Sequence, residues 1–111
     1  MMRGFFADDQ LLMLPLADHP GVRLHGEALG VHRGPLVLAL TEEAQQTEEV
    51  VVDLTDVRLL ATSVLETLAL LAARLTPPQR LLVRAGAELE LRERIAARGW
   101  DRIGTLRLAD S

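Results

Sequence analysis

The sequence predicts an α/β domain in which a mixed sheet of about five strands begins with an antiparallel hairpin and continues with alternating helices and parallel strands. Near the N-terminus, two short apolar runs flank a Pro20-Gly21 turn, which is typical of a hairpin. Further along, apolar runs alternate with stretches of helical periodicity, the order that right-handed crossovers turn into a parallel sheet. At 111 residues, the chain fits one folded domain, in which residues 1–16 form an N-terminal extension or an edge strand.

The first half of the chain is expected to contain the hairpin, one helix and the central strand. The hairpin strands are predicted at 11–16 and 22–25. Gly34-Pro35 then introduces a helix, because proline suits the first helical turn. The apolar stripe of this helix consists of Leu36, Val37, Leu40 and Ala44. Residues 50–54 are β-branched and apolar on both faces, which predicts a strand that is fully buried.

The second half is expected to alternate between helix and strand. A helix is predicted over 63–75, where Thr76-Pro77-Pro78 ends it, and a short strand over 81–83. One further helix is predicted over 87–98, stopped by Gly99. The alternating residues 103–108 predict a last edge strand.

Composition excludes several classes of function. A formal charge of −4 and a pI near 5.3 argue against nucleic-acid binding, which needs clustered basic residues. Without cysteine there is no disulfide, thiolate metal site or cysteine nucleophile. No apolar run is long enough to span a bilayer, so we expect a cytoplasmic protein without membrane insertion.

Motifs for enzymes, metals and cofactors are also missing from the sequence. The three histidines are spaced too irregularly for a helical metal pair and are expected to be solvated, and the glycine-rich segment 26–34 lacks nucleotide-binding motifs. No acid/base or nucleophile pair is placed together, so we expect no enzyme activity, no metal and no cofactor.

The most informative stretch is 50–68, where a buried strand runs through a polar turn into an amphipathic helix. Asp53-Leu54-Thr55-Asp56-Val57 and Ala61-Thr62-Ser63-Val64-Leu65 follow each other in this stretch. Their order resembles the signature of STAS domains, the family of anti-sigma factor antagonists, which runs Asp-Leu-Ser-Gly-Val, two apolar residues, then Asp-Ser-Ser-Gly-Leu. The resemblance extends over about 22–108, and the chain diverges from the family at the second part of the motif. It implies a STAS-like fold.

The resemblance also implies a role for the hydroxyl groups at the start of the second helix. In the family, the second hydroxyl of Asp-Ser-Ser-Gly is phosphorylated by a partner kinase, and that position is Ser63, with Thr62 beside it. In this chain Ala61 replaces the family Asp, and Val64 replaces the family Gly. A second interpretation remains open, because Ser63 and Glu66 have the spacing of a capping box that only stabilises the helix.

Two acidic residues are candidates for the same site. Asp53 is expected to end the central strand, and Asp56 is expected to lie in the turn that follows. Together they would form an acidic rim beside Ser63. Alternatively, their carboxylates bond nearby backbone amides, as aspartates in turns do.

The resulting hypothesis is a bacterial regulatory protein-binding module with the partner of an anti-sigma factor antagonist, namely an anti-sigma factor or a serine kinase-type regulator. The expected binding residues are Asp53, Asp56, Leu59, Thr62, Ser63 and Val64, with Ser63 and Thr62 as phosphorylation candidates in transcription regulation. The alternative is a scaffold or accessory subunit that needs no phosphorylation, as in stressosome-like or lipid-transport assemblies. A homodimer is compatible with either hypothesis.

Overall fold

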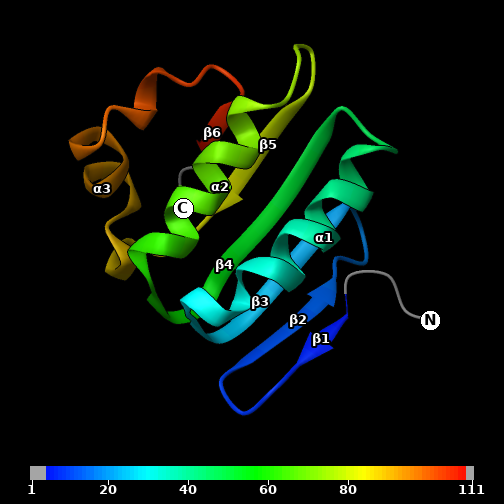
Figure 1. Ribbon diagram of the computed structural model, residues 1–111, viewed down its shortest axis with the longest axis vertical. Helices are drawn as coiled ribbons and strands as arrows, with labels where there is room; N and C mark the ends of the chain where they lie inside the picture. Colours follow the sequence, from blue (N-terminus) through cyan, green and yellow to red (C-terminus); the bar gives the residue numbers. More distant parts are fainter. Residues whose placement is uncertain (1–4, 110–111) are drawn as a thin grey trace.

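The structure is a computed structural model that describes residues 5–109 (Figure 1). The strands are β1 (Phe6–Ala7), β2 (Leu11–Pro15), β3 (Gly21–Ala28), β4 (Glu49–Leu60), β5 (Arg80–Arg84) and β6 (Leu106–Ala109). The helices are α1 (Arg33–Ala44), α2 (Thr62–Ala73) and α3 (Leu91–Ala97), with the short 3₁₀ helices η1 (Gly30–His32), η2 (Ala87–Leu89) and η3 (Trp100–Arg102). The predicted α/β class is confirmed.

The described strands form one six-stranded sheet in the order β1-β2-β3-β4-β5-β6. β1, β2 and β3 pair antiparallel, and the pairs from β3 to β6 are parallel. The predicted mixed sheet with an N-terminal hairpin is therefore confirmed. It has one strand more than expected, because Phe6 and Ala7 pair with Met13 and Leu12 and form the outer edge.

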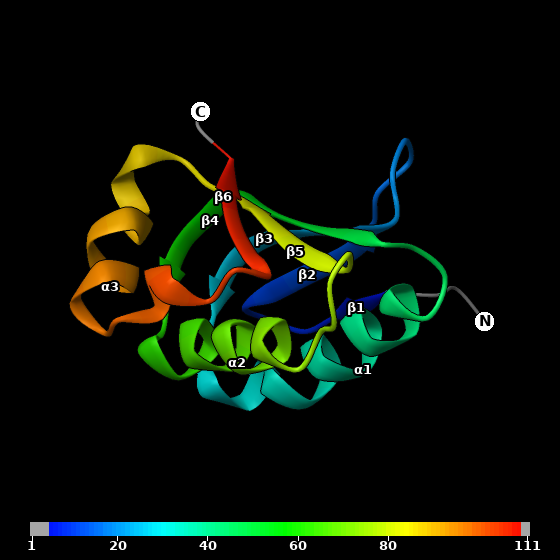
Figure 2. The same ribbon diagram turned by 90° about the horizontal axis from the view of Figure 1, so that it is seen from above.

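Helices α1 and α2 lie next to each other on one face of the sheet, while α3 lies towards the β5–β6 edge (Figure 2). The hydrophobic core fills the layer between α1, α2 and the sheet. Its central members are Leu24, Leu36, Leu40, Val50, Val52, Leu54, Leu65, Leu68, Leu81 and Val83. Residues 50–54 are all buried, as the apolar run predicts.

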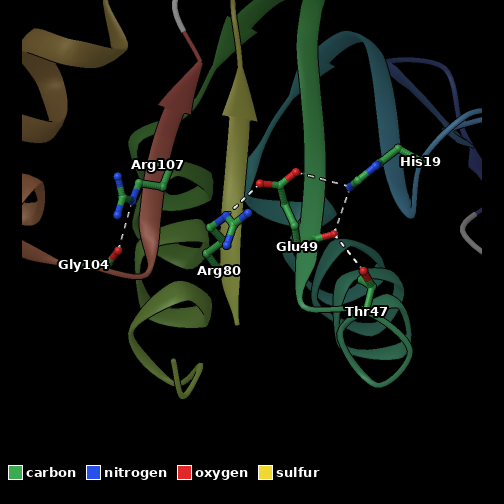
Figure 3. Close-up of polar contacts among 6 residues, drawn as sticks. All are labelled: His19, Thr47, Glu49, Arg80, Gly104 and Arg107. Atoms are coloured by element: carbon green, nitrogen blue, oxygen red, sulfur yellow. Dashed lines mark hydrogen bonds and ion pairs between the residues drawn. The ribbon is translucent and has the colours of Figure 1, made fainter. Parts of the chain in front are cut away.

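The sheet face opposite α1 and α2 carries charged pairs of residues beside apolar ones such as Val51 and Leu82. Successive side chains of a strand point to opposite faces, so Glu49 and Arg80 lie on this second face. The Arg80 Nε donates to Glu49 Oε2 at 2.8 Å, and His19 Nε2 lies 3.5 Å from Glu49 Oε1 (Figure 3). At the next edge, Arg107 Nε donates to the Gly104 carbonyl oxygen at 3.4 Å (Figure 3). Charged groups therefore lie on the sheet face that α1 and α2 do not cover.

Strand β4 is longer than the sequence indicates. It continues through Asp53 and Asp56 to Leu60, so the prediction that Asp53 ends the strand and Asp56 lies in a turn is wrong. The cause is the parallel pairing with β3, which extends to the pair Ala28 and Leu60. Irregularities in the pairing, which absorb extra residues as β-bulges do, allow this polar segment to stay in the sheet.

The C-terminal third departs from its predicted boundaries. The single helix expected over 87–98 is divided at Glu90, whose φ of 52° lies in the left-handed region and separates η2 from α3. Gly99 ends α3 with a φ of 75°, as predicted for a helix-terminating glycine. The last strand begins at Leu106 rather than at residue 103, because Trp100–Arg102 form η3. Among residues 5–109, every helix is too short or too polar to cross a bilayer.

Candidate functional site

The start of α2 lies at the end of the central strand, next to the turn that leads into α1. β4 ends at Leu60, and α2 begins at Thr62. On the neighbouring strand, the carbonyl oxygen of Ala28 accepts a hydrogen bond of 2.9 Å from the Ala61 N–H. This bond ties the β3–α1 connection to the β4–α2 connection, so η1 lies beside the first turn of α2 (Figure 1).

Ser63 is the second residue of α2, and its hydroxyl does not cap the helix. The N-cap residue is Ala61, and no side chain caps α2. The capping box predicted for Ser63 and Glu66 is therefore wrong, because a capping oxygen belongs to the residue just before the first helical one. Within residues 5–109 the Ser63 hydroxyl has no hydrogen-bond partner, and no unpartnered side-chain oxygen there is fully buried. The hydroxyl is consequently accessible to solvent and makes no hydrogen bond within the described residues.

Gly30 of η1 forms one wall of the space around this hydroxyl. A carbon atom added at the Cβ position of Gly30 would lie 3.3 Å from Ser63 Oγ. On the other side, the Ser63 carbonyl oxygen accepts a hydrogen bond of 2.8 Å from Thr67 Oγ1, one turn further along α2. Nothing in the local sequence indicates Gly30, because its place beside Ser63 comes from the pairing of β3 with β4.

The chain around the start of α2 carries two hydroxyls and two exposed aliphatic side chains, one in η1 and one near the end of β4. Thr62 is exposed and Ser63 is half-buried, while Leu59 is 51% exposed and Val31 is 74% exposed. We call these four residues the α2 entrance surface. Val64 was expected to take part in it, but it is 0% exposed and packs into the core. The surface therefore forms without Val64, because that side chain lies on the helix face turned towards the sheet.

Asp53 has a structural role within β4. Its Oδ1 accepts hydrogen bonds from the Thr55 N–H at 3.0 Å and from Thr55 Oγ1 at 2.7 Å. Its Oδ2 accepts from Arg23 Nε at 3.2 Å. Burial raises the pKa of Asp53, but the hydrogen bonds from Thr55 and the charge of Arg23 outweigh it and hold the pKa below its ordinary value. The carboxylate thus stabilises an irregular segment of the strand.

The acidic rim expected beside Ser63 is not formed. Asp53 lies seven positions before Leu60 in β4, which corresponds to about 23 Å along a regular strand. Asp56 lies closer to the end of the strand, and its Oδ2 is 3.2 Å from His25 Nδ1. Both carboxylates face partners on β3 rather than the start of α2.

His32 anchors η1 from below. It is 1% exposed, so the expectation that all histidines are solvated is wrong at this position. Its Nδ1 accepts a hydrogen bond of 2.9 Å from the Leu29 N–H, which leaves the proton on Nε2 to be donated to Asp8 Oδ2 at 2.8 Å. The Phe6 ring packs edge-on against the imidazole, with 5.8 Å between the ring centroids. Strand β1 and the turn that follows it therefore help to hold the turn that contains Gly30.

Arg94 of α3 anchors the other side of the site. Its Nη2 donates a hydrogen bond of 2.7 Å to the carbonyl oxygen of Leu60, which is the last residue of β4. Its Nη1 donates to the Leu89 carbonyl oxygen at 3.4 Å. In the sequence this arginine belongs to a helix of mixed charge, and nothing local indicates that it reaches the central strand.

The comparisons with known proteins give a match in three dimensions. No family model matches the sequence, and no curated protein matches it. Among solved structures, the chain is similar to the crystal structure of an anti-sigma factor antagonist from Mycobacterium paratuberculosis. The two share 25% sequence identity, and the match covers 91% of this chain and 88% of that chain with a TM-score of 0.71.

The likeness covers nearly the whole of both chains. It agrees with the order of strand, polar segment, hydroxyl and helix at 50–68. Together, the motif order and this match identify the chain as a STAS-like domain with the fold of an anti-sigma factor antagonist.

Proposed function

We propose that this protein is a regulatory protein-binding module that binds an anti-sigma factor or a serine kinase-type regulator through the α2 entrance surface, with Ser63 as the phosphate acceptor. The observation that carries the proposal is the uncommitted Ser63 hydroxyl at the start of α2. The fold of an anti-sigma factor antagonist supports the same role. Thr62 is the second acceptor candidate, because it is adjacent and exposed.

The start of α2 tolerates a phosphate group. The first amides of a helix lack intrahelical acceptors and carry a partial positive charge, which favours an anion at that end. In the transfer step, Ser63 Oγ attacks the γ-phosphorus of ATP held by the partner kinase. The bond to the ADP oxygen breaks as the Oγ–P bond forms, and the hydroxyl proton passes to a base of the kinase. The phosphoserine adds a charge of about −1.5 to −2 at neutral pH.

This charge would act on the interface rather than on the fold. Val31 in η1 and Leu59 near the end of β4 are the exposed aliphatic side chains of the α2 entrance surface. A partner that covers such area must desolvate Ser63, and desolvating a phosphate is far more costly than desolvating a hydroxyl. Unmodified protein is therefore expected to bind, and phosphorylated protein is expected to be released.

A scaffold that needs no phosphorylation is the second candidate. The observation that favours it is the replacement of the family Asp by Ala61 and of the family Gly by Val64. Ala61 provides no carboxylate beside the acceptor, and the buried Val64 provides no backbone freedom there. In this alternative the α2 entrance surface binds a constant partner, or a second copy of the chain.

The experiment that separates the two candidates is intact-mass analysis of the protein isolated from its own cells, with fragmentation to locate any added phosphate. We expect phosphate on Ser63, and its loss in Ser63→Ala. Thr62→Ala is the matched control, since it removes the adjacent hydroxyl and should leave the Ser63 phosphate in place. Protein that stays unmodified across growth and stress conditions would contradict the switch and favour the scaffold.

A further inference from the structure

A groove runs between α1 and α2 on the surface that faces away from the core. It encloses about 670 Å³ and continues into a narrower pocket of about 230 Å³, which reaches Val50 and Leu81 of the sheet. The two spaces share Val37, Thr41, Leu71 and Arg74 as lining residues, so they form one continuous hollow.

Apolar side chains make up most of the walls. Leu38 of α1 is 63% exposed and Leu70 of α2 is 57% exposed, and both line the groove. Val37 and Leu71 form the deeper walls. Exposed leucines on two adjacent helices form a contiguous apolar area, which is typical of a surface that another protein covers.

The charged residues that line this groove are two arginines. Arg33 is the first residue of α1, and Arg74 directly follows α2. Each helix connects two parallel strands of the sheet, so α1 and α2 run in the same direction and the two arginines lie at opposite ends. Arg33 Nε donates to the Gly30 carbonyl oxygen at 3.2 Å. Within residues 5–109, no ion pair neutralises either guanidinium.

We propose that this groove binds an amphipathic helix of the partner protein, with apolar residues on one face and an acidic residue towards each end. The inference rests on the proposed function of partner binding. α1 has 12 residues, which gives the groove a length of about 18 Å and room for about three helical turns. Apolar anchors spaced at i, i+3, i+4 and i+7 fill such a groove, and the two carboxylates pair with Arg33 and Arg74.

The Arg33 end of the groove is also the Ser63 end. Arg33 is held by the carbonyl of Gly30, and Gly30 is the residue that lies against Ser63 Oγ. Thr67, which lines the groove, donates its hydroxyl hydrogen bond to the Ser63 carbonyl. A phosphate on Ser63 therefore competes with the carboxylate of the partner helix for Arg33, which connects modification to release.

The test uses a synthetic peptide of about 14 residues, cross-linked to stay helical, with leucines at the anchor spacing and glutamate at both ends. A second peptide carries lysine in place of each glutamate. Binding is measured by fluorescence anisotropy, and the contact area is mapped by chemical shifts of ¹⁵N-labelled protein. We expect the glutamate peptide to bind more tightly than the lysine peptide, with shifts confined to α1 and α2.

The variants give the expected fold-changes. Arg33→Glu and Arg74→Glu should each weaken binding of the glutamate peptide by about fivefold, and the double variant should prefer the lysine peptide. Leu70→Gln should weaken both peptides by about tenfold, as loss of a central anchor does. Arg102→Glu is the matched control, since it makes the same charge change at an exposed position of η3 outside the groove.

Three outcomes would overturn the proposal. The first is equal affinity for the two peptides. The second is an affinity for the glutamate peptide that does not change in Arg33→Glu and Arg74→Glu. The third is co-sedimentation with phosphatidylglycerol vesicles that needs Leu38 and Leu70, which would assign the groove to a lipid surface.

The proposed function is tested separately, because phosphate on Ser63 is detected without any peptide. Phosphate with no peptide binding rejects the groove alone, and peptide binding without phosphate rejects the switch alone.

Discussion

Gly30 and Ser63 lie next to each other across two connections that are separate in the sequence, so that a Cβ atom at position 30 would crowd the Ser63 hydroxyl. A Cβ atom there would lie 3.3 Å from Ser63 Oγ, closer than most carbon atoms approach an oxygen. A side chain at position 30 would thus push the Ser63 side chain or the turn by a few tenths of an ångström, and the backbone of Gly30 itself has no unusual conformation. The turn before α1 therefore borders the proposed acceptor site, as the first turn of α2 does.

Gly30→Ala tests this contact. The added methyl group must displace the Ser63 side chain or the turn, so we expect a loss of about 1 kcal/mol in the free energy of unfolding and a lower phosphate occupancy of Ser63. Urea denaturation and intact-mass analysis give the two readouts. Gly34→Ala is the matched control, because nothing lies within 4 Å of its Cβ position. It should gain about 0.5 kcal/mol through helix propensity, and an equal loss in both variants would contradict the contact.

Ser63→Ala tests the absence of capping. Because Ser63 is the second residue of α2 and does not cap it, the substitution should change the free energy of unfolding by less than about 0.5 kcal/mol. A true N-cap serine would lose about 1 kcal/mol. Glu66→Ala should be equally neutral. Urea denaturation of both variants gives the answer, and a loss of 1 kcal/mol in each would restore the capping box.

His32→Ala tests the anchor beneath Gly30. The substitution removes a side chain that is 1% exposed and leaves the Leu29 N–H without its acceptor. We expect a loss of about 2–4 kcal/mol in the free energy of unfolding. His25→Ala is the control, since His25 is partly exposed and pairs only with Asp56 at the surface. Its loss should stay below about 1 kcal/mol, and similar losses in the two variants would contradict the buried role of His32.

Two aspartates make the fold sensitive to acid. The backbone amides of Gln10 and Leu11, followed by His32, hold the pKa of Asp8 below its ordinary value. Hydrogen bonds from Thr55 and Arg23 do the same for the pKa of Asp53 against the effect of burial. A carboxyl with a lowered pKa in the folded state contributes stability above its unfolded pKa, and this stability is lost as pH falls through the folded pKa.

The expected result is a free energy of unfolding that decreases as pH falls below 3.8, the ordinary pKa of these carboxyls. Asp53→Asn should be less stable than the unsubstituted protein at neutral pH. Its free energy of unfolding should decrease less on acidification, because one of the two carboxyl groups no longer titrates. Arg23→Gln is the intermediate control, since it keeps the hydrogen bonds from Thr55. Chemical denaturation from pH 7 to pH 2.5 measures these slopes, and a slope in Asp53→Asn equal to that of the unsubstituted protein would reject the role of Asp53.

Local patterns predicted much of the architecture. The Pro20-Gly21 turn predicted the hairpin, and the β-branched run at 50–54 predicted a buried strand. Helical periodicity predicted both helices of the main layer, with Pro35 in the first turn of α1. In each case the signal lies within a dozen residues, because a hydrophobic face or a turn is encoded locally.

The site depended on contacts that are distant in the sequence. β4 extends through Asp53 and Asp56 because β3 pairs with it to the end, and that pairing is not visible in β4 itself. The Ala61 N–H is fixed by Ala28, which sets the start of α2 at Thr62 and leaves Ser63 past the cap. The order of strand, hydroxyl and helix was predictable from the sequence. That Ser63 does not cap α2 was not predictable, because it depends on the pairing of β4 with β3.

Ala61→Asp would supply the cap that α2 lacks. Ala61 has the extended backbone of an N-cap residue, with φ −64° and ψ 146°, and only an oxygen-bearing side chain is missing. The new carboxylate can accept from the N–H of Ser63 or Val64 and lies at the positive end of the helix. We expect the free energy of unfolding to rise by about 1 kcal/mol.

Ala61→Asn is the control that separates the hydrogen bond from the charge. It should keep most of the gain in stability, and the additional gain of Ala61→Asp should shrink in high salt. Urea denaturation at two salt concentrations measures both effects. If neither variant is more stable, the N–H groups in the first turn of α2 already have hydrogen-bond acceptors, and the absence of a cap at Ala61 is contradicted.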